Sequence, residues 1–231
     1  DLVGLEAHWW VIDAFASPPG PALARFPSVD VEWQENGLRL LRVDATEATR
    51  ALETLRLEGP VHREWIGIQT EWRSIHEGIA YGRRSLMLDN GPIDVDGGRL
   101  RLLCRTWVAP DPDEVSRAGL RVDLVPQYEE SRRAFDLSPS TTESRGLVFD
   151  RLRRSLHLAP GEALLLVPEH PDASWSTEPD GTTEGSVGPQ PQRVPTIGMG
   201  LLTSAARPED PGSRRAIVLL IAHAPASFEV R

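Results

Sequence analysis

Apolar and polar residues alternate along much of the chain, and this alternation predicts β-strands. In residues 5–15, one face carries apolar side chains from Leu5 to Val11, as in a strand, whose side chains point alternately to its two sides. The same period predicts strands over residues 29–33, 38–43 (after a turn at 35–37), 66–72, 75–81, 99–109 and 120–124. Residues 163–167 form a continuously apolar strand, predicted to be buried on both faces, and residues 216–222 form a closing apolar strand.

One segment has the period of a helix. Asp44 is a residue type that caps helices, and Glu47 stands three positions later, as in a capping box. The apolar stripe that follows consists of Ala48, Ala51, Leu52 and Leu55. Gly59-Pro60 is expected to end this helix. Residues 147–158 fit a helix or a strand, and the alternation before the Pro160-Gly161 turn favours a strand.

The two strands over residues 99–109 and 120–124 each carry one charged face. Their charged residues are Arg99, Arg101, Arg105, Arg121 and Asp123. Apolar side chains such as Leu100 and Cys104 occupy the opposite face of the first strand, which follows a predicted turn at residues 96–98. Because a hairpin joins the two strands, their charged faces are expected to lie side by side and form cross-strand ion pairs.

Composition narrows the class of protein. With 231 residues, 40% hydrophobic and 26% charged, the chain is neither disordered nor fibrous. The patterns together predict a mainly β fold with one or two helices (α+β), in a single domain over residues 1–231. Residues 169–193, rich in Pro and Gly, are predicted to be an exposed loop.

Charge and cysteine content exclude several functions. A net charge of −9 argues against a nucleic-acid partner. The single cysteine excludes an intramolecular disulfide and a cysteine-based zinc site. All 25 basic residues are arginine, which indicates either a genome rich in G and C or a surface that needs planar guanidinium groups.

The motif search finds no catalytic, metal or cofactor site, so the chain is not expected to be an enzyme or to hold a cofactor. His62 with Glu64 could share a strand face, whereas His76 with Glu77 could not, and no third ligand is close in sequence. The chain has no nucleophile elbow, phosphate-binding loop or dinucleotide fingerprint. Cys104 is predicted to be a buried, inert thiol.

The tryptophans leave two interpretations open. Six of the seven fall on predicted strands, where they either pack in the core or form a carbohydrate platform or an interfacial aromatic belt. Trp9 and Trp10 are adjacent, so one ring points to each face of the strand. If both are buried, that strand is covered on both sides, as in a double-layered wall.

Three late segments resemble a known family as a series. They are Gly119-Leu120-Arg121-Val122-Asp123-Leu124-Val125-Pro126, then Pro160-Gly161-Glu162-Ala163-Leu164-Leu165-Leu166, then Val194-Pro195-Thr196-Ile197-Gly198 with residues 214–222 after it. In order and spacing they resemble the C-terminal domain of bacterial secretins, ring-forming outer-membrane channels of type II and type III secretion and of pilus systems. The matching positions are Gly119, Leu120, Val122, Pro126, Gly161, Glu162, Val194, Pro195 and Gly198.

The earlier half is more loosely similar. Residues 5–14 resemble the opening strand of the secretin domain, and residues 45–57 the helix that follows it. Two departures concern the pore itself. Residues 81–85 do not match the family's gate element, and residues 199–204 lack its second proline-containing repeat.

The resemblance implies a secretin-like antiparallel β-sheet, as a segment of a multimeric double-walled β-barrel. It implies a non-catalytic subunit of a ring-shaped outer-membrane pore for protein secretion or pilus passage. The expected partners are further copies of the chain, the outer membrane and other secretion-system components, with no nucleic acid. The charged residues from Arg99 to Asp123 would then face the lumen or a neighbouring subunit.

The expected location is the cell outer membrane or the periplasm. A chain that starts at Asp1 is expected to have lost a targeting segment or to be a piece of a longer one. Two alternatives remain open at this point. One is a secretin-derived soluble periplasmic or cell-surface scaffold without a pore, and the other is a β-rich secreted carbohydrate-binding domain that uses exposed tryptophan.

Overall fold

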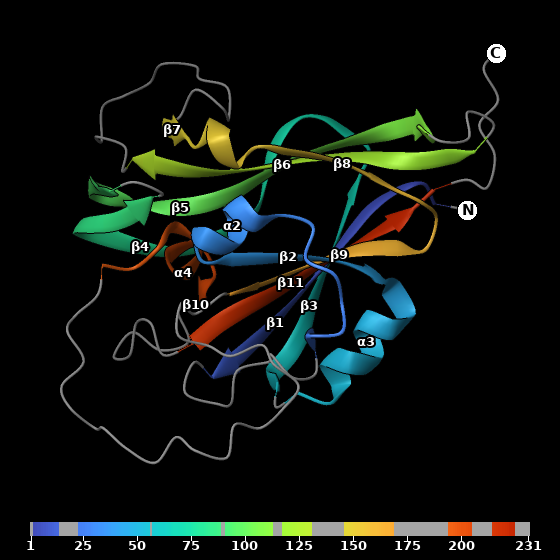
Figure 1. Ribbon diagram of the computed structural model, residues 1–231, viewed down its shortest axis with the longest axis horizontal. Helices are drawn as coiled ribbons and strands as arrows, with labels where there is room; N and C mark the ends of the chain where they lie inside the picture. The colour runs from blue at the N-terminus through green and yellow to red at the C-terminus, as the bar shows by residue number, and fades with distance from the viewer. Residues whose placement is uncertain are drawn as a thin grey trace.

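Two antiparallel β-sheets stacked face to face dominate the computed structural model (Figure 1). The structure describes residues 2–13, 23–55, 57–88, 91–112, 117–130, 146–168, 194–204 and 214–224. Within these residues the protein is mainly β, as the sequence predicts, with three short α-helices where one or two were expected, and neither sheet closes on itself.

The first sheet has the strand order β2-β9-β11-β1-β3, with a short β10 added to β11. Its strands are β1 (Gly4–Asp13), β2 (Leu38–Asp44), β3 (Leu57–Gly67), β9 (Glu162–Pro168), β10 (Thr203–Ser204) and β11 (Arg214–His223). β11 therefore lies at the centre of the sheet, between β9 and β1, although it is the last strand of the chain.

The second sheet has the strand order β4-β5-β6, and β6 pairs with two further strands along its length. Its strands are β4 (Gln69–Leu88), β5 (Gly91–Pro110), β6 (Ala118–Glu130), β7 (Gly146–Val148) and β8 (Arg154–Leu158). The chain passes from the first sheet to the second at Gly67, whose φ of 71° is a backbone conformation that glycine adopts readily.

The helices are α2 (Val31–Glu35), α3 (Ala45–Glu53) and α4 (Ile197–Leu201), with a 3₁₀ turn η1 (Asp150–Leu152). α3 is the helix that the sequence predicts. The Asp44 carboxylate accepts hydrogen bonds from the backbone N–H groups of Thr46 and Glu47, which satisfies two donors of the first turn. The buried stripe of α3, formed by Ala48, Ala51 and Leu52, packs against the side of the first sheet that faces away from the second sheet.

The hydrophobic core lies in two layers. The larger one fills the space between the sheets, and it includes Leu5, Leu40, Ile75, Leu100, Leu102, Cys104, Leu120, Val122, Leu164 and Val218. The second layer lies between α3 and the other side of the first sheet, and it includes Trp10, Leu41, Leu52, Leu165 and Leu219. Trp9 packs against the layer between the sheets and Trp10 belongs to the other, so the first sheet is covered on both faces.

Most of the predicted strands are confirmed. Residues 163–167 lie in β9 with every side chain fully buried, and the closing run lies in β11. The long-looped hairpin is confirmed as β5 and β6, which begin their pairing at Pro110 and Ala118. The ambiguous segment resolves into β7, η1 and β8, so the strand interpretation holds for residues 154–158.

Three predictions about local structure are wrong. Residues 29–33 are not a strand, because the Asp30 side chain caps the helix α2 at the N–H of Trp33. The Trp33 indole, fully buried, donates to the carbonyl oxygen of Leu152 at 2.7 Å. Trp33 and Leu152 are 119 positions apart in the chain, so a local sequence pattern cannot predict this hydrogen bond.

The other two wrong predictions concern glycine. Gly59-Pro60 does not end the helix, which stops at Glu53, but lies inside β3. The predicted turn at residues 96–98 lies inside β5, where Gly97 has a φ of 69° and its carbonyl oxygen accepts from the Tyr128 hydroxyl at 2.9 Å. The predicted loop at residues 169–193 lies outside the described residues.

Candidate functional site

The arginines of β5 and the Arg/Asp face of β6 lie side by side on the outer side of the second sheet. We call the set Glu77, Arg99, Arg101, Arg105, Arg121, Asp123, Gln127 and Glu129 the charged face. In the β5–β6 ladder, Arg101 stands opposite Gln127, and Arg105 stands opposite Asp123. The predicted cross-strand ion pairs are therefore confirmed for Arg105 with Asp123, at 2.8 Å.

One half of the charged face is centred on Glu129. Its two oxygens accept from Arg101 Nη1 at 2.8 Å and from Arg99 Nε at 3.0 Å. Arg101 is only 4% exposed, and its Nε also donates to Gln127 Oε1 at 2.7 Å. Arg99 Nη1 also lies 2.6 Å from a carboxylate oxygen of Glu77 on β4, so this half of the charged face joins β4, β5 and β6.

The other half is centred on Asp123, which is almost fully buried. One carboxylate oxygen accepts from Arg105 Nε at 2.8 Å, and the other accepts from the Ser155 hydroxyl at 2.6 Å. Arg121 Nε lies farther away, at 3.8 Å from the same carboxylate. A buried carboxylate is stable only when its lone pairs are matched in this way.

Aromatic rings support the charged face. The Arg105 guanidinium lies 4.8 Å from the centroid of the Trp72 ring and 5.4 Å from that of Trp107, and Arg153 lies 5.1 Å from Trp72. Such cation–π contacts hold an arginine flat against its neighbours. Trp72 is also buried with Leu103 and Val125, which agrees with the core interpretation left open by the sequence. Arg105 and Trp107 are two positions apart on one strand face, and this spacing could have indicated their contact.

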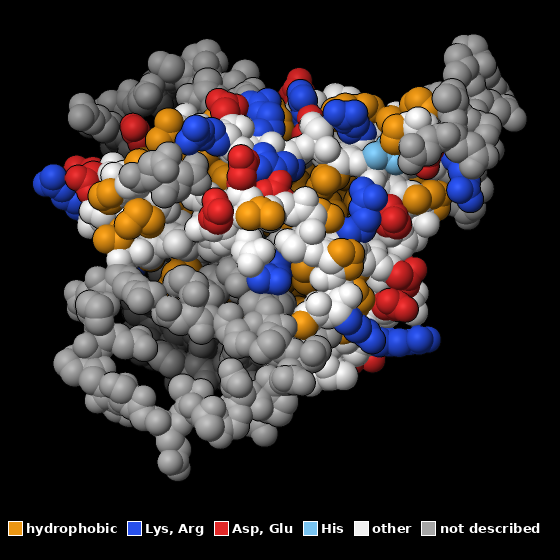
Figure 2. All heavy atoms as spheres, in the orientation of Figure 1, with side chains coloured by type: hydrophobic (Ala, Val, Ile, Leu, Met, Phe, Trp, Pro, Cys, Tyr) orange, Lys and Arg blue, Asp and Glu red, His pale blue; other side chains and the backbone are white. Residues whose placement is uncertain are grey.

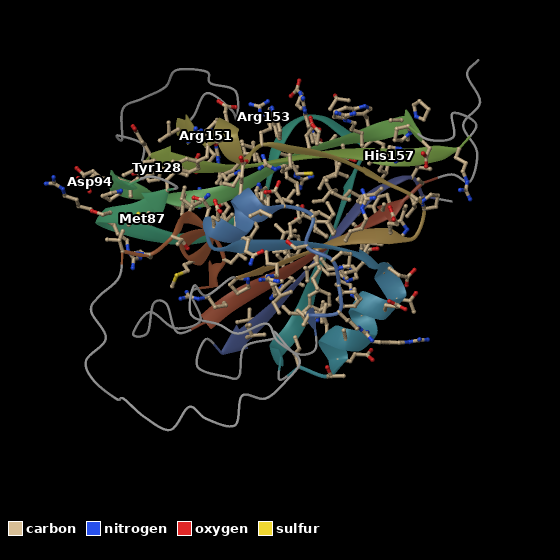
Figure 3. All side chains as sticks on the ribbon, in the orientation of Figure 1. Met87, Asp94, Tyr128, Arg151, Arg153 and His157 are labelled. Atoms are coloured by element: carbon tan, nitrogen blue, oxygen red, sulfur yellow. The ribbon has the colours of Figure 1, made fainter. Side chains whose placement is uncertain are left out.

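Positive and negative groups are interspersed on the surface rather than segregated. Figure 2 shows blue and red side chains mixed along the part of the molecule where the second sheet lies. At its rim, Arg154 pairs with both Asp30 and Glu32, which ties β8 to α2. Figure 3 places Arg153 beside this rim and His157 toward the opposite end of the sheet. The charged face is cross-linked, because its acids and bases pair with one another.

The family-like residues on β6 hold the two layers together. Leu120 and Val122 are fully buried between the sheets. A Cβ at Gly119 would lie 2.5 Å from the carbonyl oxygen of Leu158, so glycine is needed for the approach of β8. The carbonyl oxygen of Pro126 accepts from the N–H of Phe149 at 3.1 Å.

The remaining family-like residues lie at junctions between elements. Gly161, with a φ of 82°, forms the predicted turn into β9, and the Glu162 side chain accepts from the N–H of Ala159 at 2.9 Å to close it. Val194 is half-buried, the Pro195 carbonyl oxygen accepts from the N–H of Met87 at 2.8 Å, and the N–H of Gly198 donates to the Asn36 carbonyl oxygen at 2.8 Å.

The histidine pairs considered from the sequence meet in one place. His62 and Glu64 from β3, and His76 and Glu77 from β4, line the same pocket between the sheets. Among the described residues, no three His, Cys, Asp or Glu side chains are arranged to hold a metal ion. Cys104 is fully buried, and burial together with the nearby charge of Asp123 raises the pKa of its thiol, which keeps it in the inert form.

One cluster was not anticipated from the sequence. Glu6 on β1 accepts from His8 Nε2 at 2.8 Å through one oxygen and from His223 Nε2 at 3.0 Å through the other. Burial of the Glu6 carboxyl raises its pKa, but these hydrogen bonds and charges outweigh burial, so the pKa lies below its ordinary value. The Trp65 ring packs against that of His223 with a centroid distance of 5.4 Å and an angle of 56° between the ring planes. The pairing depends on the β1–β11 register, which a local window cannot show.

Comparison with known proteins adds no relative. No family model, no curated protein and no solved structure matches the chain. Among the described residues, no helix is both long and apolar enough to cross a membrane.

Proposed function

We propose that the chain is a secretin-like, non-catalytic subunit of a ring-shaped outer-membrane pore for protein secretion or pilus passage. The observation that carries the proposal is the two-layer wall of open sheets. β3 ends the first sheet and β4 ends the second, so strands of a neighbouring copy could extend both layers.

The placement of the family-like residues supports the proposal. They lie on β6, at the turn into β9 and before α4, and each of them positions backbone or core rather than a reacting group. Because the secretin-like residues have structural positions, the resemblance concerns the architecture of the two stacked sheets. This fits a structural subunit better than a catalyst.

The charged face supports the same role. Its acids and bases are cross-linked by ion pairs over β4, β5 and β6. A surface of this kind suits contact with a watery lumen or with the polar face of an adjoining subunit.

The test is the oligomeric state of the full chain. We expect large, detergent-resistant rings in negative-stain electron micrographs and a matching mass by light scattering. A protein that stays monomeric at high concentration, with detergent and lipid supplied, would refute the ring.

A second candidate is a secretin-derived scaffold without a pore, and the β4–β5 hairpin favours it. Leu86 and Val95 of the hairpin are buried with Ile197 of α4 in the core between the sheets. Met87 is also tied to the segment before α4 by its bond to Pro195, and Figure 3 shows Met87 and Asp94 together at the end of the hairpin. A hairpin packed in this way is not a free gate. Rings that give no conductance in planar lipid bilayers would favour the scaffold over the channel.

A further inference from the structure

A pocket of about 390 Å³ opens between the two sheets, where β3 and β4 diverge. The side chains that concern its chemistry are Trp9, His62, Glu64, Ser74, His76 and Glu77. The volume lies near the lower end of the range for small-molecule sites, about 300–1,000 Å³. The pocket shares Glu77 with the charged face but lies apart from its Arg105–Asp123 centre, and the role proposed above does not use the cavity.

The wall on the first sheet is aromatic and polar. Trp9 and His62 stand opposite each other in the β1–β3 ladder, and Ala7 stands opposite Glu64. Trp9, His62 and Glu64 therefore occupy the same side of the sheet, which is the side facing β4. Trp9 is half-buried against the core, so it presents part of an indole to the pocket.

The wall on the second sheet carries a neutral imidazole. His76 Nε2 lies 3.1 Å from the carbonyl oxygen of Leu201, which assigns the ring proton to Nε2 and leaves Nδ1 as a hydrogen-bond acceptor. Burial lowers the pKa of His76 to about 4, so the ring is uncharged at neutral pH. Ser74 also lines the pocket, and its hydroxyl donates to the carbonyl oxygen of His76 at 3.4 Å.

The carboxylates of the pocket are already neutralised by arginines. Glu64 pairs with Arg73, and this ion pair joins the two sheets, since Glu64 lies on β3 and Arg73 on β4. Glu77 pairs with Arg99 at 2.6 Å. A carboxylate has about four lone-pair sites, so each retains acceptor capacity without adding net charge to the pocket.

We propose that this pocket binds a neutral sugar of one or two pyranose rings. The apolar face of a pyranose stacks on an indole such as that of Trp9, and its hydroxyl groups donate to carboxylate and imidazole acceptors such as Glu64 and His76. The inference does not rest on ring formation: the pocket lies within a single chain.

The experiment is isothermal titration calorimetry of the full chain with a panel of neutral sugars, namely glucose, N-acetylglucosamine, cellobiose and maltose. We expect saturable binding of at least one of them with millimolar or tighter affinity. His62 lines the pocket opposite Trp9 and offers a second imidazole to a sugar hydroxyl. His62→Ala, a change at an exposed position, is therefore expected to weaken that binding about tenfold, equivalent to one lost hydrogen bond. The matched control is Trp65→Phe, also on β3 but on the opposite face, which is expected to leave binding unchanged.

Three outcomes would overturn the proposal. One is no saturable heat with any sugar, from protein whose circular dichroism shows it to be folded. Another is binding that Trp65→Phe abolishes and His62→Ala spares, which would place the sugar on the other face of β3. The third is binding of choline but of none of the sugars, which would make the pocket a cation site. Electron microscopy of the same sample reports ring formation separately, so failure of the sugar site and failure of the proposed function remain distinguishable.

Discussion

Arg105 and Asp123 face each other across the β5–β6 ladder, with Arg105 Nη2 2.8 Å from a carboxylate oxygen that is almost fully buried. The pair stands on the outer side of the second sheet, and the Arg105 guanidinium is also held over the rings of Trp72 and Trp107. We therefore expect the Arg105–Asp123 ion pair to stabilise the fold, although the Arg105 side chain is about one-third exposed.

Replacing Arg105 should therefore destabilise the fold more than replacing a neighbouring arginine. Arg105→Met leaves the Asp123 carboxylate buried with its main cation removed, and we expect a loss of about 2 kcal/mol in the free energy of unfolding. The matched control is Arg121→Met, because Arg121 is more exposed and 3.8 Å from the same carboxylate, and it should lose less than about 1 kcal/mol. Urea denaturation measures both values. Equal losses of stability in the two variants would show that the Arg105–Asp123 pair contributes no more to stability than the more distant Arg121.

The stability of the protein should depend on pH through His76. Its pKa of about 4 in the folded chain lies below the ordinary value of 6.5, so between these values the unfolded chain binds more protons. Stability is therefore unaffected by this group above pH 6.5 and falls as the pH drops toward 4, by up to about 3 kcal/mol. His76→Gln should remove this part of the pH dependence. His62→Gln, on the opposite wall of the pocket, should retain it, and parallel curves for wild type and His76→Gln would contradict the prediction.

Glu6 should contribute stability in a different pH window. Its pKa is below the ordinary 4.5, so the stability it contributes is present above that value and is lost as the pH falls through the folded pKa. Glu6→Gln is expected to reduce the free energy of unfolding by about 1 kcal/mol at neutral pH, since it weakens hydrogen bonds to His8 and His223. The difference from wild type should shrink in acid. A difference that stays constant down to pH 3 would exclude this role for the carboxylate.

The close packing of α4 against β2 should be sensitive to a single methyl group. A Cβ at Gly198 would lie 2.2 Å from the carbonyl oxygen of Gly37, so Gly198→Ala forces the backbone apart. We expect a loss of about 2 kcal/mol or more in thermal or urea unfolding. Gly82→Ala is the control, because a Cβ there meets nothing within 4 Å, and it should change stability by less than about 0.5 kcal/mol.

The Cys104 thiol should be unreactive toward thiol reagents in the folded protein. It is fully buried and its pKa is raised, first by burial and then by the charge of Asp123. A thiol reagent such as dithionitrobenzoate should react with it only as fast as the chain unfolds, and fully in denaturant. Rapid stoichiometric labelling of the native protein would show that the core between the sheets opens at this position.

The arginines and Asp123 of the charged face were predictable from sequence, whereas Glu77, Gln127 and Glu129 were not, and the aromatic support was predictable only in part. Arg99, Arg101 and Arg105 alternate with leucine and cysteine, and a strand period of two assigns them to one side. The contact of Arg105 with Trp72 depends instead on the pairing of β4 with β5, which contains register shifts. The local pattern of apolar and polar residues does not reveal register shifts of this kind.

Elements with a local signal follow from the sequence alone: the strands β1, β5, β6, β9 and β11, and the helix α3 with its Asp44 cap. The helix at residues 31–35 has a local cap at Asp30 that the strand prediction overlooked, whereas the hydrogen bond of the Trp33 indole to Leu152 depends on the tertiary fold. Only the tertiary structure decided that His62 and His76 share one pocket and that Glu6 bridges two histidines. The physical reason is range: side-chain period and capping act over a few residues, whereas strand register and the stacking of sheets bring together residues that lie far apart in the chain.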